Sequence, residues 1–154
     1  METEITIPDK ILRVKGINIF EGLSVSELAA IASITEELDC GKDEFVIKEG
    51  EAGETMYLII KGTVSVLKGV EKEGAREIEL ARMGAGDYFG EMALLEDTVR
   101  SASIKTSEDS RFLVLHKQEF TEIVREYPQI ALHICRALSS RIRELGEKLQ
   151  NNEK

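Results

Sequence analysis

The residues best suited to chemistry lie in one stretch, Gly84 to Ala102, which reads GAGDYFGEMALLEDTVRSA. Gly90 would let the backbone approach a ligand closely, and a short helix beginning near Glu91 would direct free N–H groups outward, where they favour a phosphate. Arg100 can donate paired, charge-assisted hydrogen bonds to two phosphate oxygens. Because the Glu91 carboxylate would repel a phosphate, it fits such a site only by accepting hydrogen bonds from hydroxyls, which a ribose supplies. The stretch therefore indicates a site for an anionic sugar phosphate.

Glu91 and Arg100 also have purely structural explanations. A glutamate favours a helix N-terminus, and Arg100 could pair on the surface with Glu96 or Asp97. Taken singly, each residue fits the structural explanation better than the functional one. The interpretation as a site therefore depends on the elements around these residues.

Composition sets the limits for those elements. The chain has 154 residues, enough for one domain to bury a core without disulfides or a structural metal. Its 42% hydrophobic and 32% charged residues are typical of a globular protein. The formal net charge of -9 disfavours a nucleic-acid-binding surface, because such surfaces draw on clustered Lys and Arg.

The cysteines and the apolar runs indicate the cellular setting. Cys40 and Cys135 lie far apart in apolar surroundings, and we expect buried free thiols in a reducing compartment. No apolar run reaches the length of a membrane span, and the amino terminus carries charges where a signal peptide has its apolar core. We therefore expect a cytoplasmic protein that does not insert into a membrane.

Helices are predicted at the beginning of the chain. Residues 1–9 are polar and are expected to be frayed, and the apolar residues that follow predict a lead-in helix up to Gly16. Ser24 and Glu27 fit the S-x-x-E capping box that opens a helix. The periodicity after them predicts a second helix over residues 25–34.

Short runs typical of β-strands occupy the middle of the chain, between Glu36 and Leu115, and glycines or charged turns separate them. They are residues 45–47, 56–60, 63–67, 78–81, 101–105 and 112–115. Many short strands at spacings of roughly ten residues predict a β-sandwich or jelly-roll barrel. A single helical turn is expected within it, over residues 91–95.

Helical periodicity returns after Leu115. One amphipathic helix is predicted to end before Pro128, and Pro128 is placed at the start of a long final helix. An apolar stripe follows this final helix: Ile130, Ile134, Leu138, Ile142, Leu145 and Leu149. The first half of the stripe is expected to be core, and the second half favours a partner helix, as in a homodimer.

The opening stretch resembles a known motif. Phe89–Leu95 followed by Arg100–Ser103 closely resembles the phosphate-binding cassette of cyclic nucleotide-binding domains, which occur in protein kinase A regulatory subunits, cyclic nucleotide-gated channels and the catabolite activator protein. The resemblance extends over about Ile19 to Leu149. It includes further segments in the same order: Phe20–Ser24, Gly50–Gly53, Lys61–Val64 and Gly86–Asp87.

The resemblance implies a fold. It is a mainly β fold with flanking α-helices, an eight-stranded double-stranded β-helix (jelly roll) with N-terminal helices and a long C-terminal helix as a movable lid. One domain would fill residues 1–154, with a core over about 19–149 and polar ends at 1–9 and 151–154.

The resemblance also implies roles for residues. Arg100 would hold the exocyclic oxygens of the cyclic phosphate, and Glu91 would hold the ribose 2'-hydroxyl. The N–H groups of Ala93 and Ser101 would complete the anion site. The remaining expected contacts are Gly90, Met92 and Ala102 along the cassette, and Val66, Leu80, Met83, Arg141 and Leu145 around the base.

The sequence does not decide which base the nucleotide carries. In the family a hydroxyl residue directly after the cassette arginine can favour cGMP, whereas Ser101 also fits cAMP binders, and we expect cAMP in preference to cGMP. Leu145 stands where the catabolite activator protein has a threonine that contacts adenine. Arg141 or Arg143 could instead stack on the base.

Three classes of function are compatible with such a fold. We expect a non-catalytic cyclic nucleotide sensor that needs no cofactor or metal and acts on an unknown effector. A cupin-type enzyme would need a metal held largely by histidines, and the chain has only His116 and His133. The remaining alternative is a ligand-free dimerisation or docking module. No helix-turn-helix segment follows residue 150, so we expect no direct binding to DNA by this chain.

Overall fold

The computed structural model describes residues 4–69 and 77–152. These residues form two compact units. The first contains the described part of Ile34–Thr121 together with Glu4 and Ile5, and it holds the strands. The second contains Thr6–Ser33 and the described part of Glu122–Lys154, and it holds helices.

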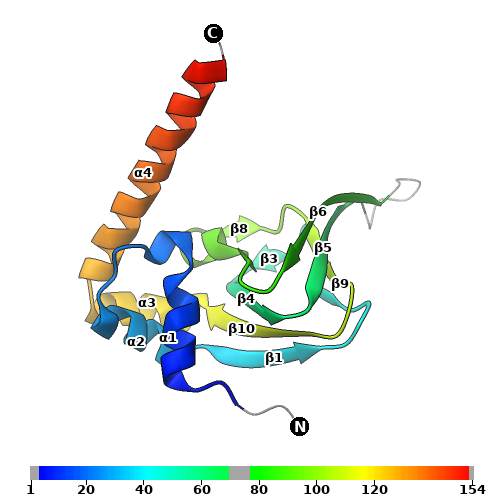
Figure 1. Cartoon of the computed structure of the whole chain (residues 1–154), viewed down its shortest axis with the longest axis horizontal. Helices are drawn as coiled ribbons and strands as arrows, with labels where there is room; N and C mark the ends of the chain where they lie inside the picture. The colour runs from blue at the N-terminus through cyan, green and yellow to red at the C-terminus, as the bar shows by residue number, and fades with distance from the viewer. Residues whose placement is uncertain (1–3, 70–76, 153–154) are drawn as a thin grey trace. The chain divides into compact units, whose positions relative to one another are not determined.

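Two four-stranded antiparallel sheets make up most of the first unit (Figure 1). One has the order β1 (Glu36–Cys40), β10 (Ser110–His116), β4 (Thr55–Lys61) and β7 (Tyr88–Phe89). The other has the order β2 (Phe45–Ile47), β9 (Ser103–Thr106), β5 (Thr63–Lys68) and β6 (Ile78–Gly84). A separate pair joins β3 (Ala52–Gly53) to β8 (Thr98–Val99), and a 3₁₀ helix, η2 (Glu91–Leu94), lies between β7 and β8 in the sequence.

The core of this unit draws buried side chains from both sheets. They are Ile59, Val64, Phe89, Ile104, Phe112 and Val114. The strands supply them because alternate residues of a strand point to one face of its sheet. The predicted mainly β, jelly-roll-like fold is confirmed: the two sheets hold eight strands, and the β3–β8 pair adds two more.

The sequence did not predict β1, β3, β7 or β8. β1 reads EELDC and is only partly buried along its length, so it shows no apolar alternation. It is a strand because it pairs with β10 in continuous register from Glu36↔Val114 to Cys40↔Ser110. The other three are two residues long and too short to show a period.

The second unit contains three α-helices and one 3₁₀ helix: α1 (Ile7–Lys15), η1 (Asn18–Phe20), α2 (Val25–Ser33) and α4 (Gln129–Asn152). The boundary between the units falls within α3 (Lys117–Glu126). The expectation that residues 7–9 are frayed is wrong. Thr6 caps α1 by accepting a hydrogen bond from the Asp9 N–H at 3.3 Å, and a proline is tolerated in a first helical turn. The ends at residues 1–3 and 153–154 lie outside the described residues.

The predicted capping box of α2 is present. The Ser24 hydroxyl accepts a hydrogen bond from the Glu27 N–H at 3.2 Å, and the Glu27 carboxylate accepts one from the Ser24 N–H at 2.9 Å. Glu27 is buried, and its carboxylate serves as a hydrogen-bond acceptor in this turn.

The expectation of two buried thiols is wrong for Cys135. Both cysteines are free, but Cys135 is exposed on α4 and Cys40 is half-buried on β1. Burial raises the pKa of the Cys40 thiol, and the nearby carboxylates of Glu44 and Asp39 raise it further. Within the described residues, no helix is long and apolar enough to cross a membrane.

The capping box yields a first prediction. Replacing Ser24 with Ala should lower the free energy of unfolding by about 1 kcal/mol, because an N-terminal N–H of α2 loses its acceptor. Urea unfolding followed by circular dichroism measures the change. The matched control is Ser26→Ala, which changes an exposed serine two residues further along, in the first turn of α2. Equal effects of the two substitutions would contradict the capping role.

Candidate functional site

A cavity of about 390 Å³ opens in the first unit beside η2. This volume lies within the range of small-molecule sites. The cavity is lined by every cassette residue predicted for the phosphate and the sugar: Gly90, Glu91, Met92, Ala93, Arg100, Ser101 and Ala102. Ile47, Val66, Met83 and Ile104 form part of its apolar lining, and all four belong to or pack against the core of the unit.

Arg100 is the buried cation of the cavity, with only 8% of its surface exposed. Its Nη2 group donates to the Thr55 carbonyl oxygen and to the Thr55 hydroxyl, both at 2.8 Å. Among the described residues no carboxylate pairs with Arg100. The surface ion pair considered above is absent, because the Asp97 carboxylate pairs with Lys117 at 2.5 Å. The guanidinium therefore has no salt-bridge partner among the described residues.

The backbone around Arg100 is fixed from both sides. Its N–H donates to the Glu51 carbonyl and its own carbonyl accepts from the Gly50 N–H, each at 2.8 Å. These bonds continue the β3–β8 pair, in which Gly53 faces Thr98. A Cβ at Gly53 would stand 3.1 Å from the Arg100 Cζ atom, so the turn approaches the guanidinium as closely as a glycine permits.

Burial lowers the pKa of the Arg100 guanidinium, and the nearby Tyr57 and Glu51 act in the opposite direction. An arginine pKa starts far above neutrality, so the group remains charged at neutral pH. A desolvated cation without an anionic partner is unfavourable unless a partner arrives. The site is thus arranged to receive an anion.

Glu91 and the backbone donors complete the polar lining. The Glu91 carboxylate is half-buried and makes no hydrogen bond to any described residue. The Ser101 N–H likewise has no acceptor within the described chain, whereas the Ala93 N–H donates to the Gly90 carbonyl at 3.1 Å. Within this cavity, the Glu91 carboxylate can accept from hydroxyls while Arg100 and at least one backbone N–H can donate to an anion. The exposed Glu96 also lines the cavity.

The residues predicted around the base are distributed differently. Val66 and Met83 line the cavity, whereas Leu80 is not part of its lining. Leu80 lies on the edge strand β6 next to a register shift and is 54% exposed. Arg141 and Leu145 are on α4 in the other unit, and their contact with a base remains a prediction.

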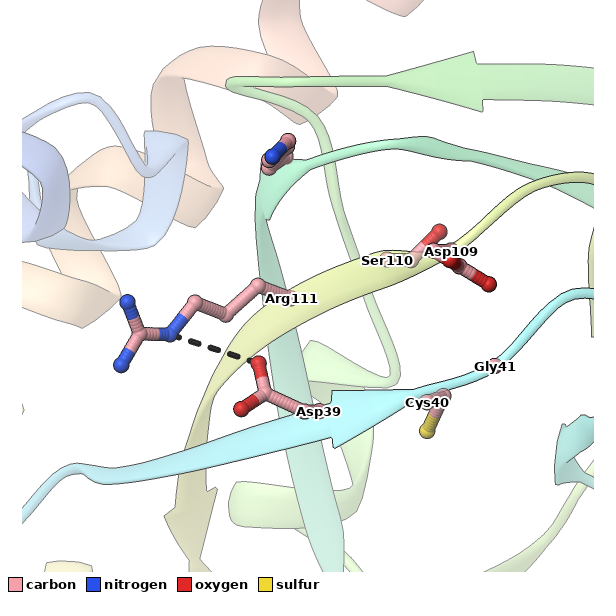
Figure 2. A pocket seen from close by; sticks show the side chains of 7 residues that line it. Asp39, Cys40, Gly41, Asp109, Ser110 and Arg111 are labelled. Carbon is pink, nitrogen blue, oxygen red and sulfur yellow. Dashed lines mark ion pairs between the residues drawn. The ribbon is translucent and has the colours of Figure 1, made fainter. Parts of the chain in front are cut away.

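A second hollow, of about 580 Å³, lies at the end of β1 and the start of β10 (Figure 2). Two cationic residues, Lys61 and Arg111, line it. The Arg111 side chain points toward Asp39, and its Nε atom lies 3.4 Å from the Asp39 carboxylate. The Arg111 Nη2 atom lies 3.1 Å from the Glu37 carboxylate. Because these carboxylates compensate its charge, Arg111 differs from Arg100 in the cavity beside η2.

The two histidines are engaged elsewhere. His116 lies 3.3 Å from the Glu36 carboxylate on the neighbouring strand. His133 Nδ1 lies 2.9 Å from the Gly22 carbonyl oxygen. Within the described residues, no group of three His, Cys, Asp or Glu side chains could hold a metal ion. Neither histidine contributes to the cavity.

Sequence reasoning did not single out Thr55 or Tyr57. Thr55 holds Arg100 from 45 positions away, and Tyr57 bonds to the Thr55 hydroxyl. Nothing in the local sequence marks this contact, since Tyr57 reads as an ordinary member of the predicted strand 56–60 and Thr55 as the residue before it. Gly53 was noted only as part of a turn, and its closeness to Arg100 is visible only in the fold.

Gly90 provides a test of how tightly this site is packed. A Cβ there would stand 2.7 Å from Arg100 Nη1 and 2.8 Å from the Thr55 carbonyl oxygen, at a φ of +80°. Gly90→Ala should therefore lower the free energy of unfolding by about 1–3 kcal/mol more than the control Gly86→Ala. Gly86 also has a positive φ, of +92°, but open space at the Cβ position. The difference between the two variants therefore measures the clash of the added methyl group and not the backbone strain. Equal losses in urea unfolding would show that the site can relax around the methyl group.

Known proteins resemble this chain over most of its length. The Cyclic AMP receptor protein of Thermus thermophilus is 30% identical over 135 residues, which is 88% of this chain and 62% of the relative. The human cGMP-dependent protein kinase 2 is 29% identical over 121 residues, which is 78% of this chain and 16% of the kinase. The chain thus spans less than two thirds of either relative.

A solved structure shows the same fold. The N-terminal domain of a transcriptional regulator from Streptomyces coelicolor A3(2) superposes with a TM-score of 0.79 at 20% identity, over 89% of this chain and 94% of that one. The family described as Cyclic nucleotide-binding domain matches residues 37–127, a segment that contains β2 to β10, β1 except its first residue, and the whole cavity lining. The chain therefore belongs to the cyclic nucleotide-binding domain family.

Proposed function

We propose that the chain is a non-catalytic regulatory domain that binds a cyclic nucleotide, with cAMP preferred to cGMP. The observation that carries the proposal is the buried guanidinium of Arg100, whose hydrogen bonds within the described residues go to the neutral oxygens of Thr55 and which borders a cavity of ligand size. An anionic phosphate would provide the missing counter-charge.

The polar lining matches the chemistry of a cyclic nucleotide. Arg100 would donate to the exocyclic oxygens of the phosphate, and the Ser101 N–H would add a backbone donor. The Ala93 N–H would join them by sharing its hydrogen bond to Gly90. The Glu91 carboxylate would accept from the ribose 2'-hydroxyl, with Met92 and Ala102 lining the sugar.

The base would rest against Val66 and Met83. The preference for cAMP is supported by a relative whose name describes it as a Cyclic AMP receptor protein, while a kinase relative carries cGMP in its name. Ser101 is the residue that would decide between the bases, because its hydroxyl can accept or donate a hydrogen bond.

The output would be a movement of α4. Arg141 and Leu145 would close over the base, so that ligand binding favours one position of the helix. At a hundredfold excess of ligand over Kd, binding makes about 2.7 kcal/mol available for such a shift. The effector would be another protein or another part of a longer chain. The net charge of -9 favours a protein rather than a nucleic acid as the direct partner of these residues.

Self-association through α4 is the second candidate function. Ile130 and Ile134 are buried, whereas Ile142, Leu145 and Leu149 on the same stripe are 70%, 61% and 65% exposed. An exposed apolar stripe on a helix favours a matching helix of a second copy. A homodimer would cover it without changing the cavity of the first unit.

Titration calorimetry with cAMP and cGMP tests the proposed binding. We expect a Kd well below millimolar for at least one of them and a lower Kd for cAMP. Arg100→Ala should weaken binding by about 1.5–3 kcal/mol through the loss of charged hydrogen bonds. Arg82→Ala is the control, because Arg82 is exposed on β6 and pairs with Glu79. If neither nucleotide binds below about 1 mM, or if both variants bind alike, the assignment fails.

Light scattering at high protein concentration tests the homodimer. The wild-type chain should have the mass of two copies, and Leu145→Glu should shift it to the mass of one, because a charge would be buried in the helix pair. Glu147→Gln serves as the control on the polar side of the helix. A monomeric mass for the wild-type chain, with and without nucleotide, contradicts self-association.

A further inference from the structure

The Thr55 hydroxyl occupies the centre of a short chain of hydrogen bonds. It accepts from Arg100 Nη2 at 2.8 Å and donates to the Tyr57 hydroxyl at 3.1 Å. A hydroxyl has one proton to donate, and the guanidinium can only donate. The proton of Thr55 is therefore directed to Tyr57, which leaves a lone pair of the Thr55 oxygen facing Arg100.

Tyr57 is held in place by the core. Its ring stacks on Phe89 with centroids 5.1 Å apart and meets the edge of Phe112 at 6.1 Å. Tyr57 and Phe89 are also register partners in the β4–β7 pair, and Phe89 directly precedes Gly90. The position of the Tyr57 hydroxyl is therefore fixed by residues that also fix the start of the cassette.

The guanidinium keeps its remaining donors for a ligand. Arginine has five N–H donors, and the two Nη2 hydrogens point to the Thr55 carbonyl and hydroxyl oxygens. Nε and Nη1 have no acceptor among the described residues, and Nη1 lies against Gly90, where a Cβ would be 2.7 Å away. The Nη1 group thus lies beside the cassette turn that lines the cavity.

We propose that Thr55 is a positioning residue for anion binding, and that Tyr57 orients its hydroxyl. Thr55 acts through Arg100: it holds Nη2 and so fixes the plane of the guanidinium, which leaves the Nη1 group beside Gly90 oriented to donate to a phosphate oxygen. Because both acceptors on Thr55 are neutral, they orient the guanidinium without neutralising it, as a carboxylate would. The ligand class is a monoanionic phosphate diester, and this inference rests on the proposed function of the site.

Calorimetry with cAMP and with adenosine distinguishes the positioning of the Arg100 guanidinium from a general change in the packing of the cavity. Thr55→Val keeps the shape of the side chain but removes the acceptor, and we expect about tenfold weaker binding of cAMP. Thr55→Ser should restore the affinity to within about threefold, and Tyr57→Phe should fall between the two. Adenosine lacks the phosphate, so its affinity should be the same in all four proteins.

The matched control is Thr63→Val, which makes the same change on β5 outside the cavity lining. It should leave both affinities unchanged. Equal cAMP affinities for the wild-type chain and Thr55→Val overturn the positioning role. An equal weakening of cAMP and adenosine binding also overturns it, because the substitution would then have altered the pocket as a whole.

A spectroscopic measurement on the ligand-free protein tests the positioning independently of the nucleotide. Nitrogen-15 NMR should show slowed rotation of the Arg100 guanidinium in the wild-type chain, lost in Thr55→Val and kept in Thr55→Ser. The spectrum of Arg100→Lys assigns the signal. If the guanidinium rotates slowly but the chain binds no cyclic nucleotide, the proposed function is refuted and the positioning role is not. If the guanidinium of the wild-type chain rotates freely, the positioning role is refuted.

Discussion

A buried positive charge that has no salt-bridge partner among the described residues is the constraint on which the site depends. Removing a guanidinium from water is unfavourable, and Arg100 recovers only part of that free energy from the neutral oxygens of Thr55. Gly53 and Gly90 let the backbone approach the Arg100 side chain closely, because a Cβ at either position would crowd that side chain. Both glycines therefore help to position the charge.

Much of the fold and of the site could be predicted because the signals are local. The capping box needs only Ser24 and Glu27 in the right spacing, and strands such as β5 and β10 show their apolar residues in the sequence. The cassette is contiguous, so a glycine, a carboxylate and an arginine within a few positions already indicated an anionic sugar phosphate. The fold then brings all of them to one cavity.

What the sequence did not predict depends on contacts between distant segments. β1 is a strand because β10 pairs with it, despite its run of acidic residues. The role of Thr55 requires a partner 45 positions away. Leu80 was expected at the base, but the register shift between Val66 and Leu67 changes how β6 faces its neighbour. Such shifts arise from the geometry of strand pairing and leave no pattern in a single sequence.

The short strands that flank the cassette determine when its conformational entropy is lost. β7 pairs with β4 immediately before Gly90, and β8 pairs with β3 immediately before Arg100, so the segment between them is closed at both ends. Ordering this loop is therefore a cost of folding the barrel rather than of binding. A ligand that enters the cavity meets donors already in position, and little of its binding free energy is spent on arranging them.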